Sequence, residues 1–443
     1  MTMSFRPLAR SLAVLSFTFG LGFLALEPAE AVEIQEVTSP GGIKAYLVED
    51  YTNPLIAMKF AFKGAGTTLD ADGKGGTGNL LSGLLDEGAG DIKSAEFQSK
   101  LDELGVSLSF DASYDAFTGS FRTLVESQDE AFHLLSLALN QPRFDDEPIQ
   151  RIRGQIATGI IADENDPQEK AGRAFRETVY AGHPYAKPVE GTVDTLGAVT
   201  RDDLETYRKR GFAKDNLYVG VVGAIDAKTL GAKLDEVFGP LAEKADLPKV
   251  PDVSPILGKS VDVPLAVPQT NLQFALPGLK RNDKDFFAAY LVNQVLGGGP
   301  FTSRLYQEVR EKRGLAYGVS SWLSSSDHSA MLGIATATRA EAADESEKII
   351  KDEVAKMAKD GPTAEELAKA KDYVKGAYAV NNLDSSLSIA STLVGIQLDD
   401  LGIDYIDRRG ALIDAVTLDD AKRVANKLLS AKPTVVVVGP SKS

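Results

Sequence analysis

Arg310 and Tyr317 stand seven residues apart and carry side chains that donate strong hydrogen bonds. The guanidinium group of arginine is a permanently charged fork of donors, and the phenol of tyrosine is a single directional donor. We expect a helix to end at Gly314, between them, and the next strand to include Tyr317 near its start. Such a turn would bring donors from two elements to one place. Taken alone, the spacing is more typical of a solvated helix face followed by an ordinary strand aromatic.

The apolar pattern along the chain predicts the elements that must position this pair. Strands are expected at 43–48, 55–62, 107–112, 116–121 and 270–275, and from residues 315 and 330. Helices are expected at 95–104, 130–139, 145–162, 286–296 and 302–313. Helices mixed with mostly antiparallel strands indicate an α+β fold.

The sequence also repeats itself, because residues 97–108 parallel residues 306–317. In the first copy, the positions equivalent to the arginine and the tyrosine are Leu101 and Leu108. The fold itself therefore does not require the pair. A repeat of this kind indicates a duplicated structural unit.

The duplication and the length of 443 residues predict two domains. We place them at residues 32–245 and 259–443, each a mostly antiparallel or mixed sheet layered with helices. The proline-rich stretch 246–258 suits neither a helix nor a sheet interior and is expected to be the linker. Together the two domains would form a clam-shell cleft.

Charge and the N-terminal segment indicate where the protein works. The formal net charge of −15 argues against nucleic acid or an anionic membrane as a partner. Arg6 and Arg10 precede an apolar stretch at 12–26, and a small-residue cleavage site ends at Ala31. This pattern predicts a signal peptide at residues 1–31 and a periplasmic or secreted mature protein, with an uncleaved membrane anchor as the alternative. No later stretch is apolar enough to span a membrane.

Few side chains in this sequence can hold a transition metal. There is no cysteine, which excludes disulfides, thiolate metal sites and a cysteine nucleophile. The three histidines, His133, His183 and His328, form no i,i+4 pair and no short-spaced cluster with carboxylates. We expect His133 at the edge of a helical core, His183 in a loop before a proline, and His328 in a turn. These residues predict no metal site in this chain.

Three stretches of the chain resemble the pitrilysin/insulinase family of zinc peptidases. They are Gly-Gly-Gly-Pro-Phe-Thr-Ser-Arg-Leu at 297–305, Val-Arg-Glu-Lys-Arg-Gly-Leu-Ala-Tyr at 309–317, and His-Pro-Tyr at 183–185 with Gly-Thr at 191–192. The chain is most similar to the short two-domain members related to mitochondrial processing peptidase. The resemblance covers nearly the whole predicted mature chain.

This resemblance implies that the family's zinc motif has been lost. In the family, a helix carries H-x-x-E-H, and a glutamate further along supplies the third ligand. The corresponding positions here are Asn79, Ser82 and Gly83 in the helix and Gly159 for the distant glutamate. Asparagine and glycine cannot replace imidazole on zinc, and a serine hydroxyl is a poor general base.

The resemblance also assigns roles to residues that remain. In the family, an arginine and a tyrosine at the positions of Arg310 and Tyr317 hydrogen-bond the scissile carbonyl and the peptide backbone opposite the zinc. Preorganised donors at a developing oxyanion contribute roughly 3 to 4 kcal/mol each. The glycines Gly297, Gly298 and Gly299 would form a flexible loop that approaches the substrate closely.

The function implied is that of a non-catalytic, substrate-binding subunit of a heteromeric zinc metallopeptidase. A homologous partner would carry the zinc, this chain would bind no cofactor, and the substrate would be an unfolded peptide. One alternative is a peptide-binding or scaffolding protein with no part in hydrolysis. A further alternative is an autonomous metallopeptidase with an atypical metal site.

Overall fold

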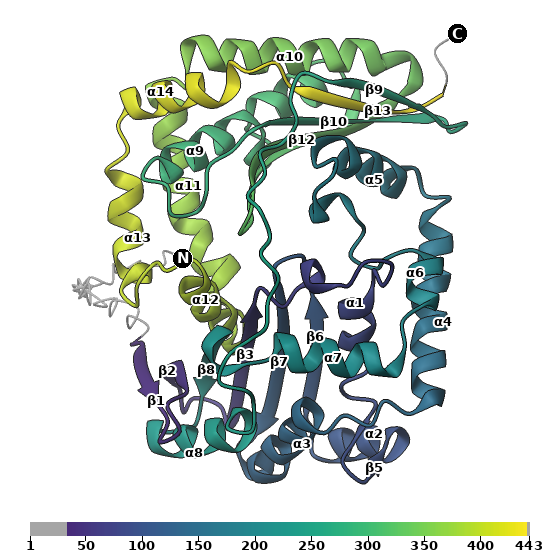
Figure 1. Ribbon diagram of the computed structural model, residues 1–443. Coiled ribbons are helices and arrows are strands. Elements are labelled where there is room, and N and C mark those ends of the chain that lie inside the picture. The colour runs from purple at the N-terminus through teal and green to yellow at the C-terminus, as the bar shows by residue number, and fades with distance from the viewer. Residues whose placement is uncertain (1–32, 441–443) are drawn as a thin grey trace, which may run out of the picture. The chain divides into compact units, whose positions relative to one another are not determined.

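The protein is described by a computed structural model over residues 33–440 (Figure 1). The predicted signal peptide at 1–31 lies outside the described residues. In the described part, no helix combines the length and the apolar character needed to cross a membrane. Helices and strands are mixed throughout, so the predicted α+β class is confirmed.

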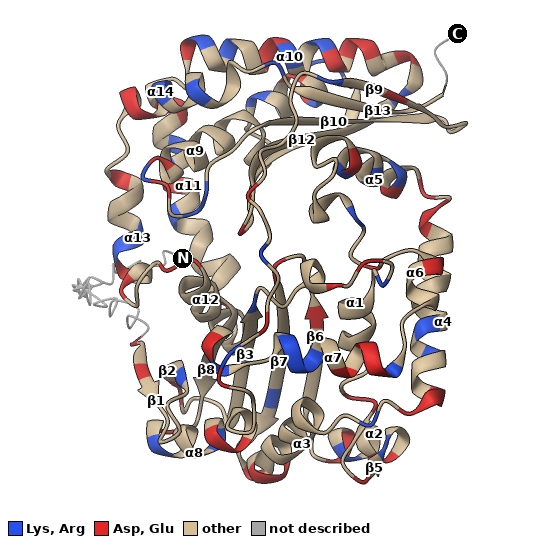
Figure 2. Ribbon diagram, in the orientation of Figure 1, with Lys and Arg blue, Asp and Glu red and all other residues tan. Residues whose placement is uncertain are grey.

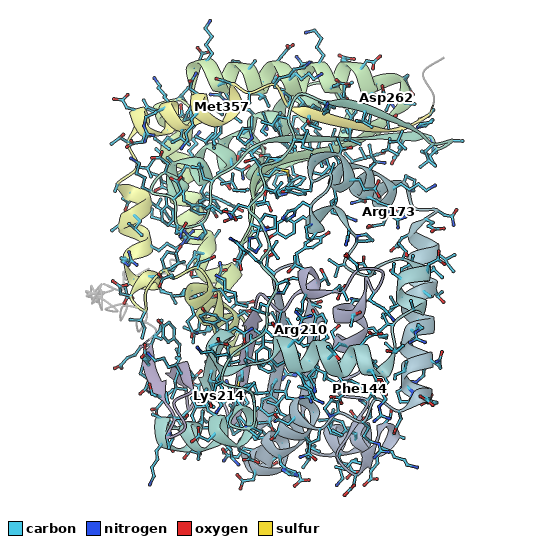
Figure 3. The ribbon with its side chains drawn as sticks, in the orientation of Figure 1. Phe144, Arg173, Arg210, Lys214, Asp262 and Met357 are labelled. Atoms are coloured by element: carbon cyan, nitrogen blue, oxygen red, sulfur yellow. The ribbon has the colours of Figure 1, made fainter. Side chains whose placement is uncertain are left out.

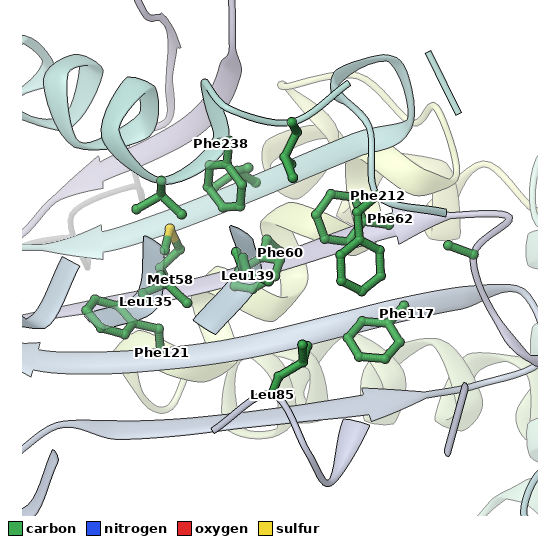
Figure 4. Close-up of a cluster of buried hydrophobic side chains, with 14 of the residues drawn as sticks. Met58, Phe60, Phe62, Leu85, Phe117, Phe121, Leu135, Leu139, Phe212 and Phe238 are labelled. Atoms are coloured by element: carbon green, nitrogen blue, oxygen red, sulfur yellow. The ribbon is translucent and has the colours of Figure 1, made fainter. Parts of the chain in front are cut away.

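The first half of the chain forms a six-stranded sheet in the order β1-β2-β8-β3-β7-β6. β2 and β8 run parallel, and the other neighbours are antiparallel. Its strands are β1 (Gln35–Thr38), β2 (Lys44–Glu49), β3 (Leu55–Lys63), β6 (Ser107–Ala112), β7 (Ala116–Leu124) and β8 (Leu217–Gly223). On β3, Met58, Phe60 and Phe62 alternate with smaller residues and enter a core that Figure 4 shows at close range.

The second half forms a five-stranded sheet in the order β11-β12-β10-β13-β9. Its strands are β9 (Ser260–Pro264), β10 (Gln269–Pro277), β11 (Ala316–Ser325), β12 (Ala330–Arg339) and β13 (Thr434–Gly439). Here β13 and β9 are the parallel pair. Five strands of the first sheet, read as β6-β7-β3-β8-β2, follow the same plan. The shared order supports the duplication seen in the sequence.

Helices and short turns connect and cover these sheets (Figure 1). In the first half they are α1 (Thr77–Ser82), α2 (Ser94–Glu103), α3 (Gln128–Asn140), α4 (Asp146–Asp163), α5 (Pro167–Val179), α6 (Val193–Gly197), α7 (Arg201–Gly211) and α8 (Ala227–Phe238). In the second half they are α9 (Phe286–Asn293), α10 (Ala343–Asp360), α11 (Ala364–Asn382), α12 (Ser386–Leu398), α13 (Tyr405–Asp414) and α14 (Leu418–Leu429). A small ribbon of β4 (Gly88–Ala89) and β5 (Ile92–Lys93) and the single turns η1 (Thr67–Leu69), η2 (Val125–Ser127), η3 (Pro184–Ala186), η4 (Lys214–Asn216) and η7 (Ala340–Ala342) complete the set.

Each sheet is covered on one face by a helix from the other half of the chain. Helix α5 packs against β10 and β13, where Phe175 joins a buried cluster with Met331 and Val436 (Figure 1). Helix α12 packs against β3 and β8, so closely that a Cβ on Gly220 would lie 2.5 Å from the carbonyl oxygen of Ala390. A division of the chain at residues 245 and 259 therefore leaves each sheet with a helix from the other half.

The proline-rich stretch 246–258 runs between the two halves without forming a helix or strand. Arg210, visible in Figure 3, fixes its beginning, because the guanidinium Nε donates to an Asp246 carboxylate oxygen at 2.8 Å. Further along, the amide of Val253 donates to the carbonyl of His328, and the amide of Ile256 donates to the carbonyl of Val179. These bonds attach the stretch to both halves.

A buried tyrosine explains the His-Pro-Tyr motif. The Tyr185 hydroxyl donates to an Asp115 carboxylate oxygen at 2.5 Å and accepts from the amide of His328 at 3.1 Å. Burial, reinforced by the neighbouring Asp115 carboxylate, raises the pKa of Tyr185. The phenol therefore stays protonated and joins the two halves.

Candidate functional site

Arg310 and Tyr317 line one pocket of about 370 Å³. Arg310 lies near the end of the π-helical segment η6 (Tyr306–Glu311), and Tyr317 lies in β11. Gly314 makes the turn between them with a φ of +60°, and its amide donates to the carbonyl of Arg310 at 2.9 Å. A left-handed φ is a conformation that glycine adopts without steric cost.

A β-bulge presents Tyr317 to solvent. Tyr317 and Gly318 on β11 together face the single residue Ala337 on β12, because the pairing shifts between Ala316 and Val319. Two threonines of β12 stabilise the bulge by donating to the carbonyls of Leu315 and Gly318.

The Tyr317 phenol is therefore available to a ligand. The side chain is 90% exposed, and its hydroxyl makes no hydrogen bond within residues 33–440. Bulges often re-aim a side chain beside an active site, and that is the effect here.

The Arg310 guanidinium is held by aromatic side chains rather than by a carboxylate. It lies over the Tyr306 ring at 4.9 Å from the centroid, and Tyr306 in turn packs edge-on against Phe301 at 5.4 Å. Stacking of this kind orients a guanidinium while leaving its N–H donors accessible. Phe301 is 65% exposed and has a φ of +61°, which is uncommon for a residue with a side chain.

The neighbouring charges do not compete for Arg310. Lys312 and Arg313 both pair with Glu308, and these two hydrogen-bonded cations lower the pKa of that carboxyl. Arg310 itself forms no ion pair in the described part of the chain. This separation weighs against the reading of Arg310 as one more charge on a solvated helix face.

The three glycines take part in close packing. Gly297 and Gly298 end the π-helical segment η5 (Gln294–Gly298), in which the amide of Gly299 donates to the carbonyl of Gln294. A Cβ on Gly297 would lie 2.7 Å from the Ser321 hydroxyl, and one on Gly299 would lie 2.9 Å from the Gln294 carbonyl oxygen. Gly297 and Gly298 therefore belong to a helical segment rather than to the expected loop. None of the three lines the pocket of Arg310 and Tyr317.

Residues at the positions of the lost zinc motif in α1 pack against neighbours or form local hydrogen bonds. Helix α1 ends at Gly83, and the Ser82 hydroxyl donates to the carbonyl of Asn79 at 2.7 Å. A Cβ on Gly83 would lie 2.9 Å from the Cγ2 methyl of Ile152 on α4. Gly159 is exposed on the same helix and has open space around it.

A buried carboxylate that the sequence analysis missed caps α1. Asp70 accepts hydrogen bonds from the amides of Gly76 and Gly78 at 2.8 and 3.0 Å. Burial outweighs these bonds and raises its pKa to about 6. The carboxylate is engaged by backbone amides, so it fixes the start of α1.

The ring nitrogens of His183 and His328 contact other protein groups. His183 uses both ring nitrogens, since Nδ1 accepts from the amide of Tyr185 and Nε2 donates to the carbonyl of Pro251. His328 contacts the Asp252 carboxylate at 3.3 Å. Within residues 33–440, no three acidic or histidine side chains gather to hold a metal ion.

His133 does not lie at the core edge, and that expectation is wrong. Its side chain is exposed and lies 3.8 Å from the Glu236 carboxylate. Its neighbours Phe132 and Leu134 both turn inward, and the helical period places His133 on the outer face of α3.

Comparisons with known proteins indicate a relationship to zinc peptidases. Residues 198–374 match a family model described as the peptidase M16 inactive domain. A protein of Streptomyces coelicolor named as an uncharacterized zinc protease is 26% identical over 457 aligned residues, which cover 99% of this chain and 94% of that protein. Residues 198–374 thus resemble the M16 inactive domain, and nearly the whole chain resembles uncharacterized zinc proteases. An uncharacterized zinc protease of Bacillus subtilis is 23% identical and covers 92% of this chain and 98% of its own length.

Solved structures place the M16 fold along nearly the whole chain. A protein from Pseudomonas fluorescens described as a peptidase M16 inactive domain aligns with a TM-score of 0.86 and 27% identity, covering 93% of this chain and 99% of that chain. A protease from Helicobacter pylori has the same fold, with a TM-score of 0.82 and 20% identity over 92% of this chain and 99% of its own. The protein is thus peptidase-like.

A half-buried ion pair holds the segment that carries Phe301 and Tyr306. Arg304 donates through Nε and Nη2 to the two carboxylate oxygens of Glu366 at 2.8 and 2.7 Å, and also to the carbonyl of Gly361. The hydrogen bonds from Arg304 lower the pKa of Glu366 to about 2. The ion pair thereby positions the aromatic support of Arg310.

We predict that Glu366→Gln weakens the fold at neutral pH and flattens its acid dependence. Because the folded-state pKa lies below the ordinary 4.5, ionised Glu366 stabilises the fold above about pH 4.5. That contribution disappears as the pH falls toward 2. The variant should lose about 1 to 2 kcal/mol of unfolding free energy at pH 7, allowing for solvent screening, and much less at pH 3. Urea denaturation at both pH values measures this.

The matched control for this ion pair is Glu365→Gln. Glu365 is exposed and, among residues 33–440, pairs only with Lys369. Its replacement should change the unfolding free energy by less than about 0.5 kcal/mol at either pH. An equal loss for Glu366→Gln at pH 3 and pH 7 would show that Glu366 does not act through its charge.

Proposed function

We propose that this chain is the substrate-binding, non-catalytic subunit of a heteromeric M16 zinc peptidase. A homologous partner would carry the zinc and the general base, and this chain would supply Arg310 and Tyr317 to that active site. One observation carries the proposal: an oriented guanidinium and an exposed phenol, neither paired within residues 33–440, open on the same pocket. The zinc positions of this chain meanwhile hold Asn79, Ser82, Gly83 and Gly159.

The chemistry proposed is metal-assisted hydrolysis of a peptide bond. Zinc in the partner would activate a water molecule that attacks the scissile carbonyl. The carbonyl oxygen then gains negative charge, and the Tyr317 hydroxyl would donate a hydrogen bond to it. Arg310 would hydrogen-bond the peptide backbone beside the reacting bond and stabilise the same charge.

An unfolded peptide is the substrate that suits this site. β11 is an edge strand of its sheet, and Tyr317, Gly318 and Ser320 on it are exposed. An extended peptide can add to such an edge through backbone hydrogen bonds. The peptide would then pass the Arg310 and Tyr317 donors irrespective of most of its side chains.

The proposed place of action is the periplasm or the exterior of the cell. The support is the sequence pattern at residues 1–31, with its basic start, apolar stretch and small-residue cleavage site.

We predict that the purified chain holds far less than one zinc ion, because it lacks the two histidines and the glutamate of the family site. Metal analysis of the isolated chain tests this, and the same analysis on a co-purified complex with an M16 homologue that retains H-x-x-E-H should find about one zinc per pair. About one zinc per isolated chain would contradict the proposal, as would failure of the two proteins to co-purify.

A further inference from the structure

A second pocket lies in the C-terminal half, between α9, α11, α12 and α13. It has a volume of about 530 Å³ and shares no lining residue with the pocket of Arg310 and Tyr317. We propose that this arginine pocket, defined by Arg281, Arg409, Phe286, Tyr378 and Tyr405, binds a small carboxylate that carries an aromatic or branched apolar body. The proposal goes beyond the proposed peptidase function and does not depend on it.

Arg281 is held by rings and not by an acidic side chain. Its guanidinium lies over Phe286 at 4.3 Å and over Tyr405 at 5.1 Å from the ring centroids, and Nη2 donates to the Tyr405 hydroxyl at 2.5 Å. Within the described residues it forms no ion pair. Asp399 is an acidic residue whose pKa is affected by Arg281. Burial raises the pKa of Asp399, and the positive charge of Arg281 partly offsets that rise.

Arg409 is the more unusual group, since its side chain is buried. Only 7% of the residue is exposed, its guanidinium lies 4.0 Å over the Tyr378 ring, and Nη1 donates to the carbonyl of Val374 at 3.2 Å. In the described part of the chain it has no carboxylate partner. A buried guanidinium without an anion is costly, so an anion entering beside it would be stabilised.

Arg409 has guanidinium donors that the protein does not use. A guanidinium has five N–H groups, and the protein accepts from one of its nitrogens. No nitrogen of Arg409 is both sealed from solvent and without a partner. Arg409 lines the arginine pocket, so the donors that the protein leaves free can reach an anion bound there.

The rest of the wall selects for an anion with an apolar body. No aspartate or glutamate lines the pocket, although the whole chain has a net charge of −15. Helices α9 and α12 contain no charged residue, and Figure 2 shows both in tan. Burial raises the pKa of Tyr378 to about 12, so its hydroxyl stays neutral at physiological pH.

The ligand class follows from these groups. Two guanidinium groups suit a carboxylate, which accepts from such donors in a forked geometry. Phe286, Phe287, Tyr290 and Ile396 supply apolar and aromatic contact area. A pocket of this size fits a ligand of roughly one or two amino-acid residues. A peptide C-terminus ending in an apolar residue and a free aromatic acid share this chemistry.

The test is calorimetric titration of the purified chain with N-acetylphenylalanine and with its neutral amide. The acid should bind at least about tenfold more tightly than the amide, because only the acid pairs with the guanidinium groups. Arg281→Gln should weaken binding of the acid by about tenfold or more, and Arg281 is open enough for this variant to fold. The matched control is Arg201→Gln on α7, which removes the same charge from an exposed position in the first half and should leave binding unchanged.

Further outcomes distinguish the two possible ligand sources and define the results that would overturn the proposal. Tighter binding of Ala-Ala-Phe than of N-acetylphenylalanine identifies peptide C-termini as the ligands, and the reverse order identifies free aromatic acids. Equal binding of acid and amide, no binding of either at millimolar concentration, or an unchanged affinity in Arg281→Gln would overturn the proposal.

Discussion

Replacing Tyr317 by phenylalanine should lower the kcat of the assembled peptidase by about ten- to a thousand-fold, the range expected when an oxyanion donor is lost. The change removes only a hydroxyl that is exposed and unbonded within residues 33–440, so the fold and the bulge remain. The loss should fall mainly on kcat, with little change in KM, because the hydrogen bond strengthens as charge develops on the carbonyl oxygen. Steady-state kinetics of the purified complex measure both constants.

A matched control separates this effect from general perturbation. Tyr373 on α11 is another exposed tyrosine and lies outside the pocket of Arg310 and Tyr317. Tyr373→Phe should leave kcat within about twofold of the unchanged complex, as surface substitutions usually do. If Tyr317→Phe behaves like Tyr373→Phe, the Tyr317 hydroxyl has no part in the reaction.

Phe175→Ala should cost about 3 to 5 kcal/mol of unfolding free energy, which is typical for deleting a buried phenylalanine. Phe175 belongs to α5 in the first half of the chain, yet its ring packs with residues of the second sheet. The substitution leaves a cavity between α5 and strands β10 and β13. Chemical denaturation followed by circular dichroism and by fluorescence gives the size of the loss.

The single tryptophan lets fluorescence show whether Phe175→Ala destabilises the second sheet. Trp322 lies in β11 of the second sheet, so its fluorescence reports unfolding of that sheet. A substitution in the first half should therefore shift the Trp322 transition. Hydrogen exchange should also rise first in β10 and β13 for Phe175→Ala, and first in β7 for Phe132→Ala, whose ring lies in the first core against Phe121. Unchanged hydrogen exchange in β13 would contradict the packing of helix α5 from the first half against the second sheet.

The duplicated α+β fold was accessible from the sequence because it depends on local patterns. Apolar residues that alternate along β3 and the turn at Gly314 each reflect geometry within a few residues. That Arg310 and Tyr317 lie close enough to line one pocket could be predicted for the same reason, since one turn separates them.

Other features depend on contacts between distant residues and could not be read from local patterns. The apolar face of α5 shows that the helix is buried, but not which of two similar sheets it covers. The helix predicted at 286–296 continues as the π-helical segment η5, in which Gly297 packs tightly against Ser321 of β11. The helix predicted at 302–313 contains the π-helical segment η6. Phe301 was also missed, although its place in the family-like stretch 297–305 was a signal.

Peptide hydrolysis by this chain alone, by a zinc-bearing M16 homologue alone, and by the two together tests the central claim most directly. The account predicts that the isolated chain cleaves no peptide, that the mixture cleaves much faster than the homologue alone, and that Tyr317→Phe in this chain removes most of the gain. Hydrolysis by the isolated chain that a chelator abolishes would contradict it, because this chain would then carry a working metal site of its own.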